Sequence, residues 1–132
     1  MVANDSIADM LTRIRNAANA KHDQVSIPYS RLKEALANIM RNEGFIGDVE
    51  VVGQGPKKVI VVGIKYTSAG EPVFNDLRRI SRLGRRVYVT AKEIRPSRQG
   101  VGVAILSTSK GVMKDVDAKR QGVGGEVLCT IW

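Results

Sequence analysis

Four consecutive residues late in the chain, Ser107-Thr108-Ser109-Lys110, carry three hydroxyl groups and one cation. Their spacing matches S-x-x-K, in which a serine nucleophile at a helix start is followed one turn later by a lysine. That acyl-enzyme chemistry also needs partner motifs of the S-D-N and K-T-G type, and the sequence contains neither. A serine acyl enzyme is therefore an alternative that the sequence disfavours.

Other reactive side chains are few and isolated. His22 has no nearby ligand or base pattern and is most simply a solvated turn residue. The single cysteine, Cys129, cannot form an internal disulfide or a cysteine-rich zinc site, which indicates a reducing, cytoplasmic environment. The run 100–105 begins like a dinucleotide fingerprint, but it lacks the third glycine and leads into an apolar strand. We therefore expect no enzyme activity, no cofactor and no metal.

The Ser107–Lys110 segment has a second chemical use, in recognition. Hydroxyl groups both donate and accept hydrogen bonds, and they suit phosphate oxygens, ribose 2′-hydroxyls and base edges. Gly111 would allow a close backbone approach. The competing interpretation is a Ser/Thr-rich turn that caps a helix starting at Lys114, and composition alone favours that turn.

Basic residues are concentrated in the second half of the chain. The net charge is +8. Residues 1–66 contain nine Lys/Arg and seven Asp/Glu, a surplus of +2, whereas residues 67–132 contain twelve and six, a surplus of +6. Such a surplus attracts polyanions. Interspersed with apolar positions and followed by Tyr88, five arginines lie within nine residues: Arg78, Arg79, Arg82, Arg85 and Arg86.

Two uses of this arginine cluster remain open. Guanidinium groups can pair with phosphates, and the Tyr88 ring can stack on an unpaired base. The same residues could instead form a solvated basic sheet edge that discourages aggregation. A general single-strand binder is a further alternative, but it would need more stacking aromatics than the six Phe, Tyr and Trp present.

Hydrophobic periodicity predicts the elements that position these residues. In the first half we expect a helix over 5–20 capped by Asn4 or Asp5, a strand over 24–27, a helix capped by Ser30 and stopped at Gly44, and a hairpin of 45–52 with 57–66. In the second half we expect extended runs at 73–81 and 86–90 around a turn at 83–85, a helical turn at 91–94, a basic loop at 95–102, a buried strand at 103–106, a polar loop at 107–111, a short helix at 114–121, a glycine bend at 122–125 and a last strand at 126–132.

The segment 67–72 has the composition of a linker, so we place a domain boundary there. The predicted fold class is α+β, with two small α/β domains. Residues 1–66 form an N-terminal α-β-α-β-β domain, and residues 67–132 form a mainly β C-terminal domain with short helices. No apolar run is long enough to span a membrane, and the N-terminus has no signal-peptide pattern.

Taken together, these residues resemble the bacterial family of the eighth protein of the small ribosomal subunit. The likeness covers nearly the whole chain and rests on the segments 5–17, 84–89, 102–113 and 122–129, and on the final Trp132. The segment 102–113, GVAILSTSKGVM, is highly specific to that family. Lys114 departs from the family pattern, in which threonine is usual, and Gln54-Gly55-Pro56 replaces a more basic turn.

The resemblance implies a ribosomal RNA-binding protein located on the cytoplasmic ribosome. It would bind a helix of the central domain of small-subunit ribosomal RNA, help to assemble the platform, contact neighbouring small-subunit proteins, and repress translation of its own operon messenger. We expect a monomer away from the ribosome. By residue match, the implied RNA contacts come from the hydroxyl segment, the sheet and the first helix: Ser107, Thr108, Ser109, Lys110, Gly111, Tyr88, Gly124, Gly125, Glu126, Asp5, Thr12, Arg15 and Asn16. Arg85 and Arg86 would add phosphate contacts.

Overall fold

The computed structural model describes residues 5–95 and 102–132. The N-terminal segment runs through α1 (Ser6–Asn19), β1 (Gln24–Pro28), α2 (Arg31–Asn42), β2 (Val49–Val52), a single 3-10 turn η1 (Gly55–Lys57) and β3 (Val59–Gly63). The C-terminal segment contains β4 (Leu77–Arg79), β5 (Tyr88–Val89), β6 (Val103–Thr108), β7 (Gly111–Lys114), α3 (Asp115–Gln121) and β8 (Gly125–Ile131). The predicted α+β class and the α-β-α-β-β order of the first segment are confirmed.

Side-chain caps define where the two long helices begin. The Asp5 carboxylate accepts a hydrogen bond from the Ala8 amide at 3.0 Å, and the Ser30 hydroxyl accepts one from the Lys33 amide at 3.1 Å. Each cap satisfies an amide that has no partner inside the helix. Past the end of α2, Gly44 has a φ of +82°, a conformation that favours glycine. The predicted Asp5 and Ser30 caps and the Gly44 stop are therefore confirmed.

The three-stranded sheet has the order β1-β3-β2, and its strands are antiparallel. Ile60 of β3 lies opposite Ile27 of β1 and Val51 of β2, so these side chains share the face that the helices cover. The hairpin of β2 and β3 turns through η1, as predicted. Both helices bury an apolar stripe against this face, which accounts for the fully buried Met10, Ile14, Leu36 and Met40.

The second sheet has the order β4-β8-β6-β7, and β5 pairs with the beginning of β8. Its central strand β6 is buried on both faces. Val103 and Ile105 join the main core, whereas Ala104 and Leu106 pack with Ala118 of α3 in a second, smaller core. Burial on both sides explains why this strand is a continuous apolar run in the sequence.

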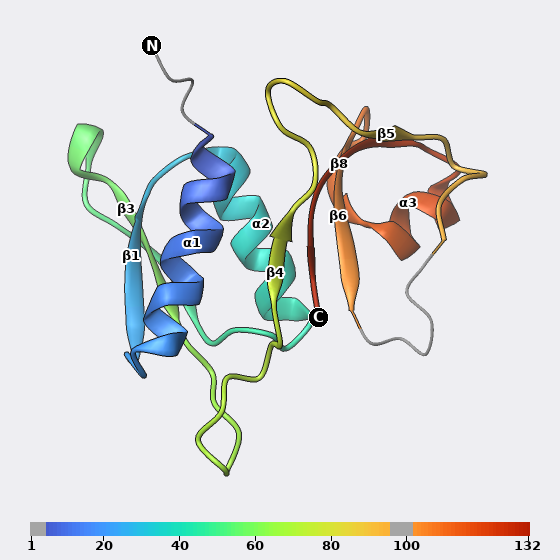
Figure 1. Ribbon diagram of the computed structural model, residues 1–132. Coiled ribbons are helices and arrows are strands. Elements are labelled where there is room, and N and C mark those ends of the chain that lie inside the picture. The colour runs from blue at the N-terminus through green and yellow to red at the C-terminus, as the bar shows by residue number, and fades with distance from the viewer. Residues whose placement is uncertain (1–4, 96–101) are drawn as a thin grey trace.

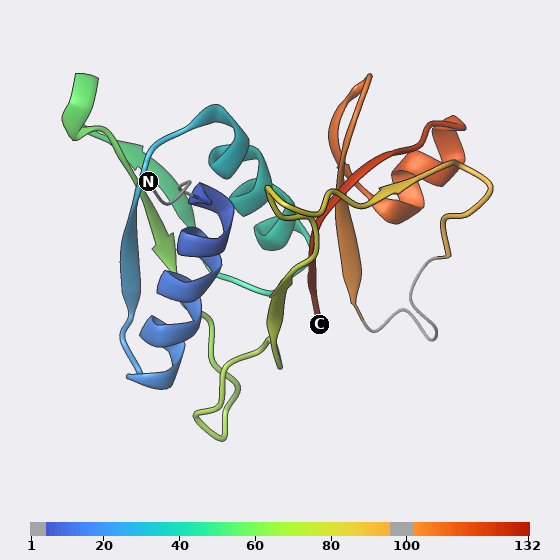
Figure 2. The ribbon, with the colours of Figure 1, turned by 45° about the horizontal axis from the view of Figure 1, so that its top comes forward.

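The molecule is layered, with α1 and α2 between the two sheets and α3 on the outer side of the second sheet (Figure 1). A view turned by 45° shows the same arrangement (Figure 2). The main core accordingly includes residues from both segments, for example Met10 and Leu36 with Leu77 and Leu128. Among the described residues, no helix is long and apolar enough to cross a membrane.

The segment predicted to be a linker is a closed loop. Tyr66 and Pro72 form a β-bridge at its base, and the Thr67 amide donates to the Glu71 carbonyl at 2.7 Å. Lys21, which follows α1, donates through Nζ to the Gly70 carbonyl at 2.6 Å. The loop therefore folds back onto the first segment, and the division into two domains at this position stays a prediction.

The prediction of a polar loop over 107–111 is wrong in part. Ser107 and Thr108 are the last residues of β6, and Gly111 is the first residue of β7, so only Ser109 and Lys110 form the turn. The strand β7 was missed because Gly111-Val112-Met113-Lys114 is short and does not alternate apolar with polar residues. The competing interpretation of a helix cap also fails, since β7 separates the turn from α3.

Other boundaries differ by a few residues. The extended run predicted over 73–81 contains only the short strand β4, and the run over 86–90 only β5. The predicted helix over 114–121 begins at Asp115, and Gly125 of the predicted glycine bend belongs to β8. Residues 91–93 form a hydrogen-bonded turn, in which the Glu93 amide donates to the Thr90 carbonyl at 3.0 Å. The basic loop predicted over 95–102 lies mostly outside the described residues.

Candidate nucleic-acid interface

The hairpin of β6 and β7 displays the hydroxyl segment at its tip. The Thr108 hydroxyl donates to the Gly111 carbonyl at 2.7 Å and accepts from the Lys110 amide at 3.1 Å, so this side chain holds the turn together. Ser109 and Lys110 are exposed, and their side chains make no hydrogen bond to another described residue. Gly111 has a φ of +114°, which a residue with a side chain would rarely adopt. The tip therefore offers a free hydroxyl and a free ammonium group on a rigid turn.

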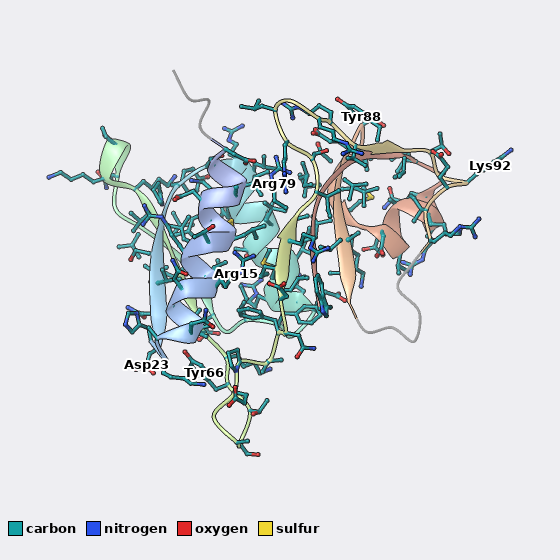
Figure 3. All side chains as sticks on the ribbon, viewed as in Figure 1. Arg15, Asp23, Tyr66, Arg79, Tyr88 and Lys92 are labelled. Atoms are coloured by element: carbon teal, nitrogen blue, oxygen red, sulfur yellow. The ribbon has the colours of Figure 1, made fainter. Side chains whose placement is uncertain are left out.

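A row of polar side chains crosses the sheet beside this tip. Glu126 of β8 lies directly opposite Tyr88 of β5 on one side and Ser107 of β6 on the other. Residues that lie opposite in adjacent strands project from the same face, so these three side chains form one surface. Tyr88 is 67% exposed and lies at the upper edge of the sheet (Figure 3).

Arg86 completes this row and balances its carboxylate. Its Nη1 lies 2.9 Å from Oε2 of Glu126. The hydrogen bond from Arg86 to Glu126 raises the pKa of the guanidinium group. The Arg86 guanidinium neutralises the charge of the Glu126 carboxylate. This explains how an acidic side chain can lie on a surface that attracts polyanions.

Gly124 and Gly125 occupy positions where strands approach too closely for a side chain. A Cβ atom on Gly124 would collide with the carbonyl oxygen of Val89, and one on Gly125 would collide with the carbonyl oxygen of Ser107. Neither glycine has a positive φ, so the requirement is close approach and not backbone conformation. These glycines let β5 and β6 close onto β8 and so bring Tyr88 and Ser107 to the same row.

The five arginines of the cluster point to different parts of the molecule. Arg82 and Arg85 join their backbones across the two-residue turn Leu83-Gly84, with both N–H···O distances at 3.0 Å, and both side chains are exposed. Arg78 is directed elsewhere, with its guanidinium 5.8 Å from the centre of the Trp132 ring. The expected turn at 83–85 is confirmed. Of the five arginines, Arg86 pairs with Glu126 in the Tyr88 row, and Arg82 and Arg85 flank the turn that precedes Arg86 in the chain.

Arg79 has a structural position. Its Nε donates to both carboxylate oxygens of Asp5, at 3.0 and 3.2 Å, and its Nη1 donates to the Leu128 carbonyl at 2.5 Å. The Arg79 side chain is only 12% exposed. Asp5, which was expected to touch RNA, is thus engaged by this guanidinium and by the amide of Ala8.

The first-helix residues expected at the interface divide into two groups. Thr12 and Asn16 are exposed on α1. Arg15 is engaged instead with β4, since its Nε donates to Asp76 Oδ1 at 3.3 Å and its Nη2 donates to the Leu77 carbonyl. Arg15 and Arg79 both lie where α1 faces β4 (Figure 3). The structure therefore brings Ser107, Glu126, Tyr88 and Arg86 together, and gives Asp5 and Arg15 contacts that tie α1 to the second sheet.

Sequence reasoning missed one residue that shapes this surface. Ser81 is fully buried, and its hydroxyl accepts from the Val87 amide at 2.8 Å and donates to the Val87 carbonyl at 3.2 Å. These bonds close the base of the loop that carries Arg82, Arg85 and Arg86. No local pattern distinguishes Ser81 from an ordinary loop serine, since its partner lies six residues further along.

Metal binding and thiol chemistry can be examined among the described residues. In the described ranges, no cluster of three or more His, Cys, Asp or Glu side chains could hold a metal ion. Burial raises the pKa of the Cys129 thiol to about 12, so that group is not a nucleophile at neutral pH. What the surface offers is hydrogen-bonding groups, cations and one open aromatic ring, which is recognition chemistry.

The sequence of this chain matches one protein family over nearly its whole length. The sequence profile described as Ribosomal protein S8 matches residues 5–132. The chain belongs to the ribosomal protein S8 family. It is 53% identical over 132 residues to the small ribosomal subunit protein uS8 of Rubrobacter xylanophilus and 52% identical to that of Geotalea uraniireducens, in each case over the full length of both chains. The uS8 protein of Synechococcus elongatus is 47% identical over 133 residues, again at full length.

Family membership removes one alternative left open by the sequence. The S8 family is a family of ribosomal proteins and not of enzymes, so the S-x-x-K spacing of Ser107 and Lys110 is not an acyl-enzyme motif. Lys114 has a clear role in this chain. Its Nζ lies 2.7 Å from Oε2 of Glu43, so it links β7 to the end of α2, and this hydrogen bond raises the pKa of Lys114.

Proposed function

We propose that this protein is an RNA-binding constituent of the small ribosomal subunit in the cytoplasm. It binds a helix in the central domain of the small-subunit ribosomal RNA, helps to assemble the platform and lies beside other small-subunit proteins. Full-length identity of about half to uS8 proteins supports the assignment to the subunit. The observation that carries the RNA proposal is the row of Tyr88, Glu126 and Ser107 beside the exposed tip of Ser109 and Lys110.

Each group on this surface has a use against a folded RNA. The Ser107 and Ser109 hydroxyls bond to base edges or ribose 2′-hydroxyls, which gives specificity for shape. The Tyr88 ring stacks on an unpaired base, and Glu126 accepts from a base amino group. Lys110 and Arg85 neutralise phosphates, so affinity falls with salt by a log–log slope of about −0.7 to −0.9 per phosphate contact. On α1, Thr12 and Asn16 are the residues available to reach the adjoining RNA backbone.

A general single-strand binder fits this surface less well. Such proteins stack successive bases on several aromatic rings. Tyr88 is the one aromatic side chain that is largely exposed in the part of the chain that the structure describes. One ring can hold one displaced base inside a folded RNA, but it cannot follow an extended strand.

Binding to the protein's own operon messenger follows from the same surface. A protein that recognises shape through hydroxyls and one stacked base binds any transcript that presents the same fold. The messenger would then compete with ribosomal RNA for one site, which provides feedback on translation. Competition between the two transcripts for the purified protein tests this, and simultaneous binding of both would contradict it.

The substitution Ser109→Ala tests the RNA proposal. It removes one hydroxyl from the exposed tip and leaves the Thr108 bonds that hold the turn. We expect specific binding to a central-domain transcript to weaken by about 1–2 kcal/mol, the cost of one lost hydrogen bond at an interface. Filter retention at fixed salt measures this. Ser68→Ala, in the exposed loop closed by Tyr66 and Pro72, is the matched control and should bind as the unchanged protein does.

Two outcomes would count against the proposal. Unchanged protein that prefers the central-domain transcript no more than bulk competitor RNA at moderate ionic strength contradicts the assignment of a specific RNA partner. A preference that Ser109→Ala leaves intact contradicts the role of the hairpin tip. Arg85→Ala provides the complementary measurement, because loss of a phosphate contact weakens binding to all RNAs similarly and lowers the salt slope by about one unit.

A further inference from the structure

A hollow of about 470 Å³ opens between the start of α1 and the turn that follows β4. It is lined by Asp5, Ala8, Arg79, Arg82, Leu83 and Gly84. Asp5, one of the residues expected to contact RNA, lies in this lining, and Leu83 and Gly84 were not among the expected contacts. The hollow lies between the start of α1 and the loop that carries Arg85 and Arg86, so a ligand in it would contact both segments.

The lining combines an apolar wall with free positive charge. Leu83 is 52% exposed at the tip of the two-residue turn, although a leucine gains nothing there from contact with water. Arg82 is exposed beside it, and its side chain makes no ion pair or hydrogen bond to another described residue. Apolar surface next to an unpaired guanidinium is suited to a ligand that has both a hydrophobic face and a negative charge.

The single carboxylate in the lining does not oppose an anion. Both oxygens of Asp5 accept from Arg79, and one of them also accepts from the Ala8 amide. The Arg79–Asp5 pair is therefore neutral as a unit. Arg82 then gives the hollow a net positive charge, and Arg85 at the other end of the same turn increases it.

We propose that this hollow is a subsite for one nucleotide of the RNA strand, with its ribose against Leu83 and its phosphate against Arg82. The proposal rests on the function proposed above. It adds a contact site between the exposed residues of α1 and the surface of Tyr88 and the hairpin tip. A ribose presents C–H groups on one face and leads directly into a phosphate, which matches the order of Leu83 and Arg82 in the turn. Charge complementarity and continuity with the loop of Arg86 and Tyr88 select RNA over a protein side chain as the occupant.

The subsite also has a rigid support. Ser81 fixes the base of the turn through its two bonds to Val87, and the backbones of Arg82 and Arg85 close the turn itself. Arg79 is held to Asp5, the N-cap of α1, and to the Leu128 carbonyl of β8. The backbone of the turn and the Arg79–Asp5 pair are therefore held in place before RNA arrives, so only the exposed side chains of Leu83 and Arg82 become ordered on binding.

The test separates the apolar contact from the ionic one. Leu83→Ala should lower affinity for a central-domain transcript by about 3-fold to 10-fold without changing the salt slope, because it removes apolar contact only. Arg82→Gln should lower affinity by about 5-fold and reduce the magnitude of the log–log salt slope by about one. Both side chains are exposed, so neither substitution should alter the urea midpoint of unfolding by much.

Matched controls come from the far end of the C-terminal segment. Val116 of α3 is 38% exposed, and Lys92 projects at the opposite end of the molecule from α1 (Figure 3). Val116→Ala and Lys92→Gln should bind as the unchanged protein does. A direct readout is the methyl NMR signal of Leu83, which should shift on addition of the transcript while the methyl signals of Val116 stay in place.

The outcomes are distinct. If the unchanged protein binds the transcript, and both Leu83→Ala and Arg82→Gln bind equally well with no shift of the Leu83 methyls, the subsite is overturned while the proposed function stands. A Leu83 shift on addition of a ribosomal protein but not of RNA would also overturn it. If the unchanged protein has no specific affinity for the transcript, the proposed function and the subsite fail together. Loss in the two variants with unaltered controls supports the subsite.

Discussion

Replacing Arg79 by alanine should reduce the stability of the whole molecule, although this residue lies in a run of arginines that looks like a surface cluster. The guanidinium joins α1 to the second sheet by bonding to Asp5 and to the Leu128 carbonyl. Its side chain is 12% exposed and that of Asp5 is 24% exposed, so water replaces these bonds only in part. Loss of Arg79 leaves the largely dehydrated Asp5 carboxylate with only the Ala8 amide as donor, and it removes the Arg79 donor from the Leu128 carbonyl.

The expected magnitude follows from these contacts. Breaking a fully buried ion pair by removing one partner costs about 3–5 kcal/mol, and an exposed pair contributes about 0–1 kcal/mol. The Asp5–Arg79 pair lies between these limits and nearer the buried one. A bond from a charged donor to a carbonyl contributes about 1.5–3 kcal/mol. We therefore expect Arg79→Ala to lower the free energy of unfolding by about 2–3 kcal/mol.

Urea unfolding followed by circular dichroism measures this change, with the dependence on urea concentration kept as a check on two-state behaviour. Arg13→Ala is the matched control, because Arg13 pairs with Asp9 on the same helix at 2.8 Å but both side chains are about half exposed. That control should cost less than about 0.5 kcal/mol. Asp5→Asn keeps a good N-cap for α1 and removes only the charge, so it should cost about 1–2 kcal/mol.

The double variant Asp5→Asn with Arg79→Ala completes a thermodynamic cycle. If the two residues interact as the structure indicates, the double variant is less destabilised than the sum of the single ones by at least about 1 kcal/mol. A cost for Arg79→Ala no larger than that of Arg13→Ala would refute the reasoning. Additive effects of the two substitutions would refute it as well.

Three further outcomes are expected. Gly125→Ala should lower the free energy of unfolding by about 2–4 kcal/mol in a urea titration, because its Cβ would strike the Ser107 carbonyl and force β6 away from β8. Thr108→Val keeps the side-chain volume but loses the bonds to Gly111 and Lys110, so we expect a cost of about 1–2 kcal/mol by the same assay and weaker RNA retention on filters. Burial raises the pKa of the Cys129 thiol from 9.0 to about 12. The contribution of the neutral thiol to the free energy of unfolding is therefore complete below pH 9 and falls by about 1.4 kcal/mol per pH unit as the pH rises from 9 towards 12. Cys129→Ala should remove this part of the alkaline decline in a urea titration.

Features set by neighbouring residues could be predicted from the sequence. The caps at Asp5 and Ser30 and the stop at Gly44 each depend on residues within one helical turn, and all three occur as expected. The run Val103–Leu106 was identified as a buried strand because apolar residues on consecutive positions imply burial on both faces. Local chemistry was enough in these places because no distant segment was needed to decide them.

Features set by distant partners could not be predicted. Arg79 and Asp5 are 74 positions apart, and Arg15 and Asp76 are 61 apart. On the sequence, Arg79 has the same surroundings as Arg78, yet the Arg79 side chain is largely covered and pairs with Asp5, whereas Arg78 lies near Trp132. Strand alternation sends neighbouring residues to opposite faces, so a count of arginines in a window does not tell which of them share a surface.

Partners distant in the sequence also determine the roles of the residues in the hydroxyl segment. Ser107 and Thr108 could be recognised as candidates by residue type, but their division of labour depends on β7 and β8. Ser107 joins the row with Glu126, whereas Thr108 projects from the other face and bonds to the turn. The family resemblance predicts that both residues contact RNA. Only the register of the strands shows that the Ser107 hydroxyl lies on the proposed binding surface and that the Thr108 hydroxyl stabilises the turn.

The strand β8 connects the support of the molecule with its proposed binding surface. Glu126 near its start lies in the row with Tyr88 and Ser107, and two residues later the Leu128 carbonyl accepts from Arg79, which is also held by Asp5 of α1. The strand β8 therefore carries part of the proposed binding surface and is also linked to α1 through Arg79 and Asp5. Because an extended pair of residues spans only about 7 Å, motion of α1 relative to the sheet would displace the Tyr88 row directly. In the proposed binding mode RNA contacts α1 and the hairpin tip at once. Rigid contact between the two segments is a condition for that mode, because the affinity gained from two simultaneous contacts depends on it.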